Sequence, residues 1–175
     1  MPEMVALRTG HRGTVDGPPL VKGERPLLTV RGTAGTTVVA TGLAVYHLGP
    51  APPRDWQRLG WEQIGLVHWD ERGASLVLTG WTPDAPRLTV LAVPRNHPLV
   101  ALARERVAST MLATTRVPVA GNGNATLTAR RQPGTDRLLW RVRLGDGVPD
   151  DPLVRAEVEA AMARLRVELG RVARA

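Results

Sequence analysis

Residues 60–81, GWEQIGLVHWDERGASLVLTGW, decide the fold, because they concentrate the aromatic surface of the chain. The stretch holds three of the five tryptophans, in a sequence with one tyrosine and no phenylalanine. Two β-rich runs, 61–69 and 74–81, lie on either side of the turn sequence DERG. This pattern predicts a β-hairpin, with Gly73 closing the turn.

The parity of the apolar residues assigns the tryptophans of this hairpin to the core. Alternation places Trp61 and Trp69 on one face of the first strand, which predicts a hydrophobic face and not a stacking platform for a ligand. Ile64 has the opposite parity, so we predict a β-bulge near Gly65 that returns it to the same face. The tryptophans that we predict to be exposed contact residues are Trp56, in a proline-rich loop, and Trp81, at a strand end.

Outward from this hairpin, strands come first, then a helix, more strands and a final helix. We expect a loose arm over residues 1–25 and a single domain over residues 26–175. The further strands are predicted at 27–30, 36–41, 43–48, 87–93, 125–131 and 137–144. A middle helix is predicted from Pro98 to about Thr114, capped by Asn96.

A terminal amphipathic helix is predicted to begin with Asp151 as N-cap and Pro152 in its first turn, and to end near Gly170. Its apolar stripe is expected to dock on a sheet. The order of elements predicts an α+β fold, an antiparallel, partly closed sheet or small barrel with a middle helix and a C-terminal amphipathic capping helix.

Composition limits the chemistry. The 175 residues carry a formal net charge of +7, and Lys22 is the only lysine among 23 basic residues. An arginine-rich, glycine- and proline-rich chain is typical of the GC-rich codon usage of an actinobacterium, and a selected anion-binding surface is the alternative. There is no cysteine, so disulfides and thiolate chemistry are absent. No signal peptide or membrane span is predicted, and we expect a cytoplasmic protein.

Two segments carry a family resemblance. TTVVATGLAVYHLG (36–49) and WQRLGWEQIGLVHWDERGASLVLT (56–79) resemble the pleckstrin-homology-like superfold of bacterial PH and GRAM-type domains. The whole chain also looks like uncharacterised actinobacterial proteins of that architecture. The resemblance covers a third to a half of the chain; it implies a binding fold and carries over no catalytic residue. The loop that would bind phosphoinositides, RGTAG, has only Arg31 as a charge, so lipid headgroups are not the expected ligand.

Catalytic motifs are missing from the sequence. There is no P-loop, no GxGxxG after a strand and no HExxH, so we predict no cofactor and no metal. His68, Asp70 and Ser75 lie close enough in the predicted hairpin to be imagined as a charge relay, but an exposed polar cluster beside a turn is the favoured interpretation. An enzyme is therefore the least favoured class.

The best candidate binding residues lie in ATLTARR (125–131) and RLLWRVRL (137–144). Alternation places Arg130, Arg141 and Arg143 on one outer face, with Arg131 at its border and Trp140 on the buried face. Guanidinium groups bind carboxylates and phosphates through paired hydrogen bonds. Like charges opposite one another on a sheet are unfavourable, which indicates an anionic partner, either a nucleic-acid backbone or an acidic protein segment; a solvated arginine face is the favoured alternative.

Three function classes remain after this reasoning. The favoured one is a non-enzymatic binding or scaffold module with a protein partner, which could also self-associate. The second is a nucleic-acid-binding protein that uses the arginines as an outward ladder, although no exposed aromatic residue is interleaved with them. The third is an enzyme with an unrecognised site.

Overall fold

The computed structural model describes residues 17–31, 36–49, 55–82, 87–92, 95–121 and 123–172. Within them the chain is α+β, as predicted, with three antiparallel sheets and two α-helices. Sheet A comprises β1 (Pro26–Arg31), β2 (Thr37–Thr41), β3 (Ala44–Leu48) and β4 (Trp56–Gly60). Sheet B comprises β5 (Ile64–Asp70), β6 (Ser75–Gly80) and β7 (Arg87–Ala92). Sheet C comprises β8 (Met111–Val119), β9 (Gly123–Arg131) and β10 (Leu138–Leu144), and the helices are η2 (Trp61–Gln63, 3-10), α1 (Pro98–Thr110) and α2 (Pro152–Val172).

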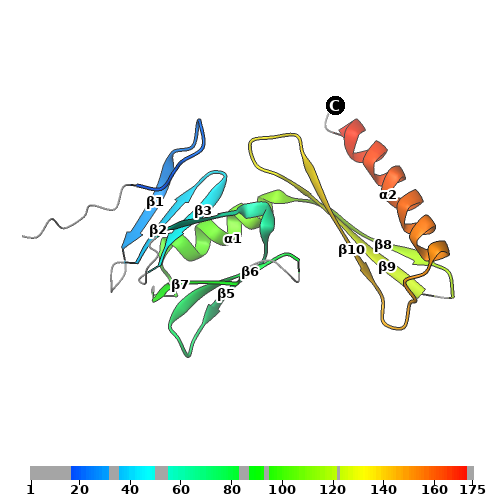
Figure 1. Cartoon of the computed structure of the whole chain (residues 1–175), viewed down its shortest axis with the longest axis horizontal. Helices are drawn as coiled ribbons and strands as arrows, with labels where there is room; N and C mark the ends of the chain where they lie inside the picture. The colour runs from blue at the N-terminus through cyan, green and yellow to red at the C-terminus, as the bar shows by residue number, and fades with distance from the viewer. Residues whose placement is uncertain are drawn as a thin grey trace, which may run out of the picture.

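The elements are arranged in two parts (Figure 1). The N-terminal half consists of sheets A and B with α1 packed between them, and the C-terminal half consists of sheet C with α2 on one face. No loop separates the halves, because α1 ends at Thr110 and β8 begins at Met111. Each half has its own cluster of buried apolar side chains.

The core of the N-terminal half joins both of its sheets to α1. Its members come from sheet A, from η2 and the hairpin of sheet B, and from one face of α1: Val38, Ala40, Val45, Leu59, Trp61, Ile64, Leu76, Leu78, Leu99, Val100, Ala103 and Val107. The predicted small barrel is wrong for the part of the chain that the structure describes, because none of its sheets closes on itself. The chain leaves sheet A through η2 and starts a new sheet, so the two sheets meet through side chains and not through strand pairing.

The hairpin of residues 60–81 matches the prediction at its centre. Trp61 is fully buried, and its indole N–H donates to the Thr41 carbonyl at 2.9 Å. The register of β5 with β6 shifts between Ile64 and Leu66, so the predicted bulge is confirmed and Ile64 is fully buried. Trp69 and Trp140 are partly buried, and Trp69 packs against the core of the N-terminal half.

Two boundaries differ from the prediction. The middle helix ends at Thr110 and not near Thr114, because the following nine residues form the strand β8, which pairs with β9. Its N-cap is His97 and not Asn96, since His97 Nδ1 accepts the Leu99 N–H at 3.2 Å. The strand β4 was not predicted, and the segment expected to begin a strand at Trp61 forms η2 instead.

The core of the C-terminal half lies between sheet C and α2. The buried side chains are Val119, Ala125, Leu127, Val154, Val158 and Ala161. The predicted cap of α2 is present, because Asp151 Oδ1 accepts the Val154 N–H at 2.9 Å. The helix continues past Gly170 to Val172.

Candidate functional site

On one face of sheet C, the two central rows of side chains consist entirely of arginine and threonine. Cross-strand partners in an antiparallel sheet share a face, so the register fixes each row. One row holds Arg116, Thr126 and Arg143, and the next holds Thr114, Thr128 and Arg141. We call these six residues the arginine–threonine face. The opposite face is apolar, because Ala125, Leu127 and Ala129 alternate with the threonines of β9 and are fully buried.

The arginine–threonine face is hollowed. A cleft of about 270 Å³ is lined by Trp81, Thr114, Thr126, Thr128, Arg141 and Arg143. A second cleft of about 350 Å³ is lined by residues that include Arg116, Asn124, Thr126, Arg143 and Asp146. Thr126 and Arg143 line both clefts, so the two clefts adjoin at this row, and we call the pair of clefts the trough.

Arg130 continues this face but does not reach solvent, so its predicted outward position is wrong. Its side chain is 2% exposed and lies 4.9 Å from the ring centroid of Trp81, over the ring. Its Nη1 donates to the Ile64 carbonyl, which lies beside the bulge in β5. Burial lowers the pKa of the Arg130 guanidinium, and the charge of Arg141 adds to this effect.

Arg141 also joins the two halves. It is half-buried, and its Nη1 donates to the Trp81 carbonyl. Trp81 is 8% exposed, so the prediction that it is an exposed contact residue is wrong. The structure therefore uses two of the predicted arginines to attach sheet C to the hairpin of residues 60–81.

The remaining predicted residues are dispersed. Arg143 is exposed on the arginine–threonine face, whereas Arg131 is exposed at the end of β9 with the opposite parity. Trp56 is half-buried and packs against Val39, Ala44 and Tyr46, so it is not the exposed contact residue that we predicted.

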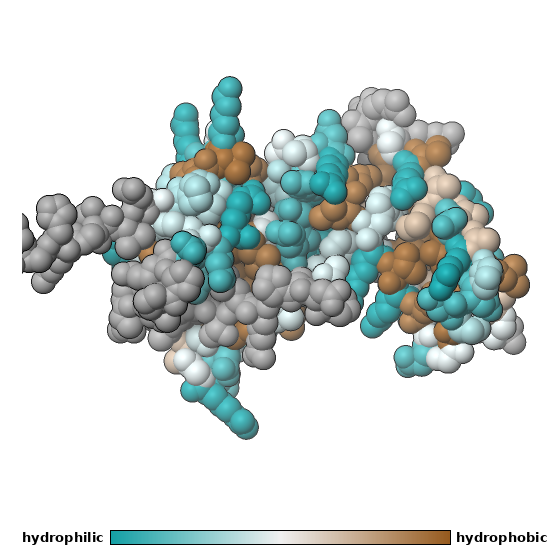
Figure 2. Space-filling view, in the orientation of Figure 1, coloured by the Kyte–Doolittle hydropathy of each residue, from teal (hydrophilic) through white to brown (hydrophobic). Residues whose placement is uncertain are grey.

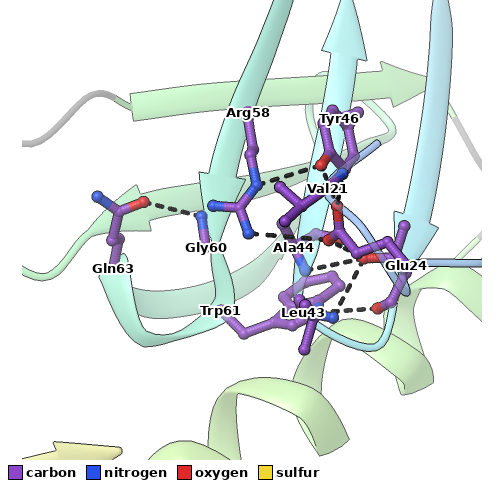
Figure 3. A network of polar contacts seen from close by, with 10 residues as sticks. Val21, Glu24, Leu43, Ala44, Tyr46, Arg58, Gly60, Trp61 and Gln63 are labelled. Carbon is purple, nitrogen blue, oxygen red and sulfur yellow. Dashed lines mark hydrogen bonds and ion pairs between the residues drawn. The ribbon is translucent and has the colours of Figure 1, made fainter. Parts of the chain in front are cut away.

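A second polar cluster lies in sheet A, where it fixes the residues before β1 (Figure 3). The carboxylate of Glu24 is fully buried and accepts hydrogen bonds from the Tyr46 hydroxyl, from Thr41 Oγ1 at 2.8 Å and from the Val21 N–H at 2.8 Å. Arg58 Nη2 lies 3.7 Å from Glu24 Oε1, and Arg58 Nε donates to the Tyr46 hydroxyl oxygen at 3.2 Å. Residues 1–16 of the predicted loose arm lie outside the described residues.

The pKa values of two buried carboxyl groups in the N-terminal half, those of Glu24 and Glu62, are shifted in opposite directions. Burial acts to raise the pKa of Glu24, but the hydrogen bonds from Tyr46, Val21 and Thr41, with the charge of Arg58, bring that pKa below its usual value. Burial raises the pKa of Glu62, against its own N–H and the charges of Arg58 and Arg130. Since three hydrogen bonds and the charge of Arg58 hold the Glu24 carboxylate inside the fold, we assign it a structural role.

The imagined charge relay is not assembled. Among the described residues, no hydrogen bond joins His68 to Asp70 or Ser75, and Asp70 Oδ1 accepts the Arg72 N–H instead. His68 Nδ1 is buried without a partner. Within the described ranges, no group of three His, Asp or Glu side chains is placed to hold a metal ion, and no helix has the length and hydropathy of a membrane span.

Two members of the site were missed in the sequence. Thr114 was placed at the end of the middle helix and Arg116 was not considered as a site residue, although the alternation of Val117 and Val119 with Arg116 and Pro118 is compatible with a half-buried strand. Comparison of the chain with protein-family models, with curated proteins and with solved structures gave no match.

Proposed function

We propose that this chain is a non-enzymatic binding module of the cytoplasm that captures an acidic segment of a partner protein on the arginine–threonine face of sheet C. One observation carries the proposal: Arg143 and Arg116 stand on either side of Thr126 in a single row along a trough. Within the described residues, neither forms an ion pair with a carboxylate. The charges of Arg116 and Arg143 are separated in this row by the neutral Thr126, and an acidic ligand would supply the carboxylates that they lack.

The chemistry of the trough fits carboxylates. Guanidinium groups donate in pairs to a carboxylate, and threonine hydroxyls supply the further donors that an anion requires when it leaves water. Asp146, which lines the far end of the trough, favours a ligand whose acidic groups lie nearer to Arg143 and Arg141.

A nucleic acid is supported less well by the same residues. Non-specific binding to nucleic acid requires many phosphate contacts, about six to ten in well-studied cases. Arg130 is buried and Arg141 is half-buried against Trp81, which leaves few guanidinium groups of this face for a polymer backbone. Trp140 lies on the opposite face, and Trp81 is covered by Arg130, so neither ring is open to stack on bases.

The proposal is tested by fluorescence anisotropy with three labelled probes of equal length. These are a glutamate-rich peptide, its glutamine analogue and a single-stranded oligonucleotide. We expect the acidic peptide alone to bind well, and the change Arg143→Ala to weaken its binding about five- to tenfold, as expected for a partly exposed charge-assisted contact. Arg72→Ala is the matched control. Arg72 is exposed in the β5–β6 turn, and its replacement removes the same charge far from the proposed site. Equal loss in both variants, or preference for the oligonucleotide, would contradict the proposal.

A further inference from the structure

The strand β10 has an open edge. It pairs with β9 through seven consecutive partners, and within the described residues no strand pairs with its other side. Exposed strand edges present unpaired N–H and C=O groups, and proteins commonly protect them with proline, bulges or very short strands. The seven residues of β10 contain no proline, and their register has no bulge. The edge is therefore long and regular enough to accept another strand.

An apolar groove follows this edge on the side of α2. It has a volume of about 340 Å³ and lies between β10 and the first half of α2. Its apolar lining residues are Val142, Leu144, Val154, Val158 and Met162, and the charged side chains of Asp150, Arg155 and Glu159 complete the lining. Val142 is 38% exposed, although it has the parity of the buried face. Figure 2 shows apolar surface gathered in the part of the molecule where β10 and α2 lie.

The opposite side of the same edge is cationic. Arg141 and Arg143 alternate with Val142 along β10 and line the cleft that ends at Trp81. Side chains of an added strand alternate between the two sides of the sheet with a repeat of about 6.8 Å. One set of its side chains would enter the apolar groove, and the other set would face the two arginines.

From this placement we infer that the partner segment binds as an added antiparallel or parallel strand on the free edge of β10, with apolar and acidic residues in alternation. The inference rests on the proposed function, and it specifies the conformation and the sequence pattern of the ligand. Main-chain hydrogen bonds would supply affinity, and the groove and the arginines would supply specificity.

Charge selects this occupant over a second copy of the chain. Two β10 strands paired edge to edge would bring Arg141 and Arg143 of one copy beside the same residues of the other, and like charges at that spacing are destabilising. An acidic segment meets the same arginines with opposite charge. On the groove side, Asp150 forms an ion pair with Arg155 at 2.7 Å, whereas among the described residues Arg143 on the arginine–threonine face has no carboxylate partner.

Peptides with one composition but different order test the inference. The first alternates valine with glutamate over nine residues, and the second carries the same residues in two blocks. Two further versions of the first are N-methylated on alternate residues, one at the valines and the other at the glutamates. The edge of a strand offers hydrogen bonds to every second residue of its neighbour. We therefore expect one methylated version to bind like the unmodified peptide, and the other, like the block peptide, to bind about tenfold more weakly or worse.

A matched pair of variants tests the groove. Val142→Glu places a carboxylate in the groove and is expected to abolish binding of the alternating peptide. Leu153→Glu is the control, because Leu153 is 60% exposed on α2 and does not line the groove. Circular dichroism and thermal unfolding show whether both variants fold.

The possible results separate the two proposals. If the alternating and block peptides bind equally, or if both methylated versions bind like the unmodified one, strand addition is overturned while acidic binding stands. If no acidic peptide binds, the proposed function fails as well. Sedimentation showing a dimer that Val142→Glu dissociates would assign the edge to a second copy and overturn the inference.

Discussion

Replacement of Arg130 by alanine is the most direct test of how the two halves are joined. The change removes a hydrogen bond from a charged donor to the Ile64 carbonyl, for which we expect about 1.5–3 kcal/mol. It also removes the stacking of the guanidinium on Trp81, for which we expect about 0.5–2 kcal/mol. The cost of burying the guanidinium charge partly offsets these two contributions. That cost is indicated by the lowered pKa of Arg130 and by its Nε, which is buried without a hydrogen-bond partner.

The net destabilisation expected for Arg130→Ala is about 2–4 kcal/mol in the free energy of unfolding. Arg130→Met keeps most of the volume and removes the burial cost of the charge, so it is expected to be about half as destabilising. The assay is urea unfolding followed by tryptophan fluorescence, with thermal unfolding as a second measure at about 2–4 °C per kcal/mol.

Arg131→Ala is the control for this test, because the neighbouring residue is exposed and is expected to change stability by no more than about 0.5 kcal/mol. The reasoning is refuted if Arg130→Ala costs less than about 1 kcal/mol, or if it costs no more than Arg131→Ala. Two separate unfolding transitions in Arg130→Ala, where the wild type has one, would show that the halves unfold independently once this contact is lost.

Three further changes probe the fold. Glu24→Gln is expected to cost about 1–3 kcal/mol at neutral pH. Because the pKa of Glu24 is lowered in the fold, its contribution is present above the ordinary carboxyl pKa and is lost as the pH falls through the lowered value. Urea midpoints measured from pH 7 downward should therefore converge for the two proteins, and a constant gap would contradict this account. Gly65→Ala would bring Cβ to 2.9 Å from the Trp81 Cα, and a loss of about 1–3 kcal/mol is expected in thermal unfolding, whereas Gly42→Ala meets nothing within 4 Å. Asp151→Ala removes the N-cap of α2 at a cost of about 1 kcal/mol by urea unfolding. A loss as large in Asp150→Ala, which removes only an exposed ion pair, would argue against the cap.

The sequence predicted the elements whose signals are local. Turn residues, alternation and the Asp151–Pro152 start marked the β9–β10 hairpin and the last helix, and the wrong parity of Ile64 revealed the bulge. The end of α1 was not predictable in this way, because Leu112 and Ala113 fit a helix as well as a strand. Pairing with β9 over nine residues decides that segment, and such pairing is a tertiary effect.

The candidate site could be predicted only in part. The face shared by Arg130, Arg141 and Arg143 follows from strand alternation and is present in the structure. Burial of Arg130 and Trp81 could not be predicted, because it depends on the N-terminal half reaching across to sheet C. Alternation assigns a residue to a face of a sheet, but it does not show what covers that face.

The separation of the two cores also bears on how the chain folds as it is made. All buried members of the first core lie between Val38 and Val107, whereas the second core requires residues from Val119 to Ala161. A ribosome therefore synthesises every residue of the first core before any residue of the second. Until β9 and β10 emerge, however, the Ile64 and Trp81 carbonyls lack the guanidinium donors of Arg130 and Arg141. The nascent N-terminal half would expose the indole of Trp81 during that interval. Arg130 would cover the indole, and Arg141 would bind the Trp81 carbonyl, only after sheet C has formed.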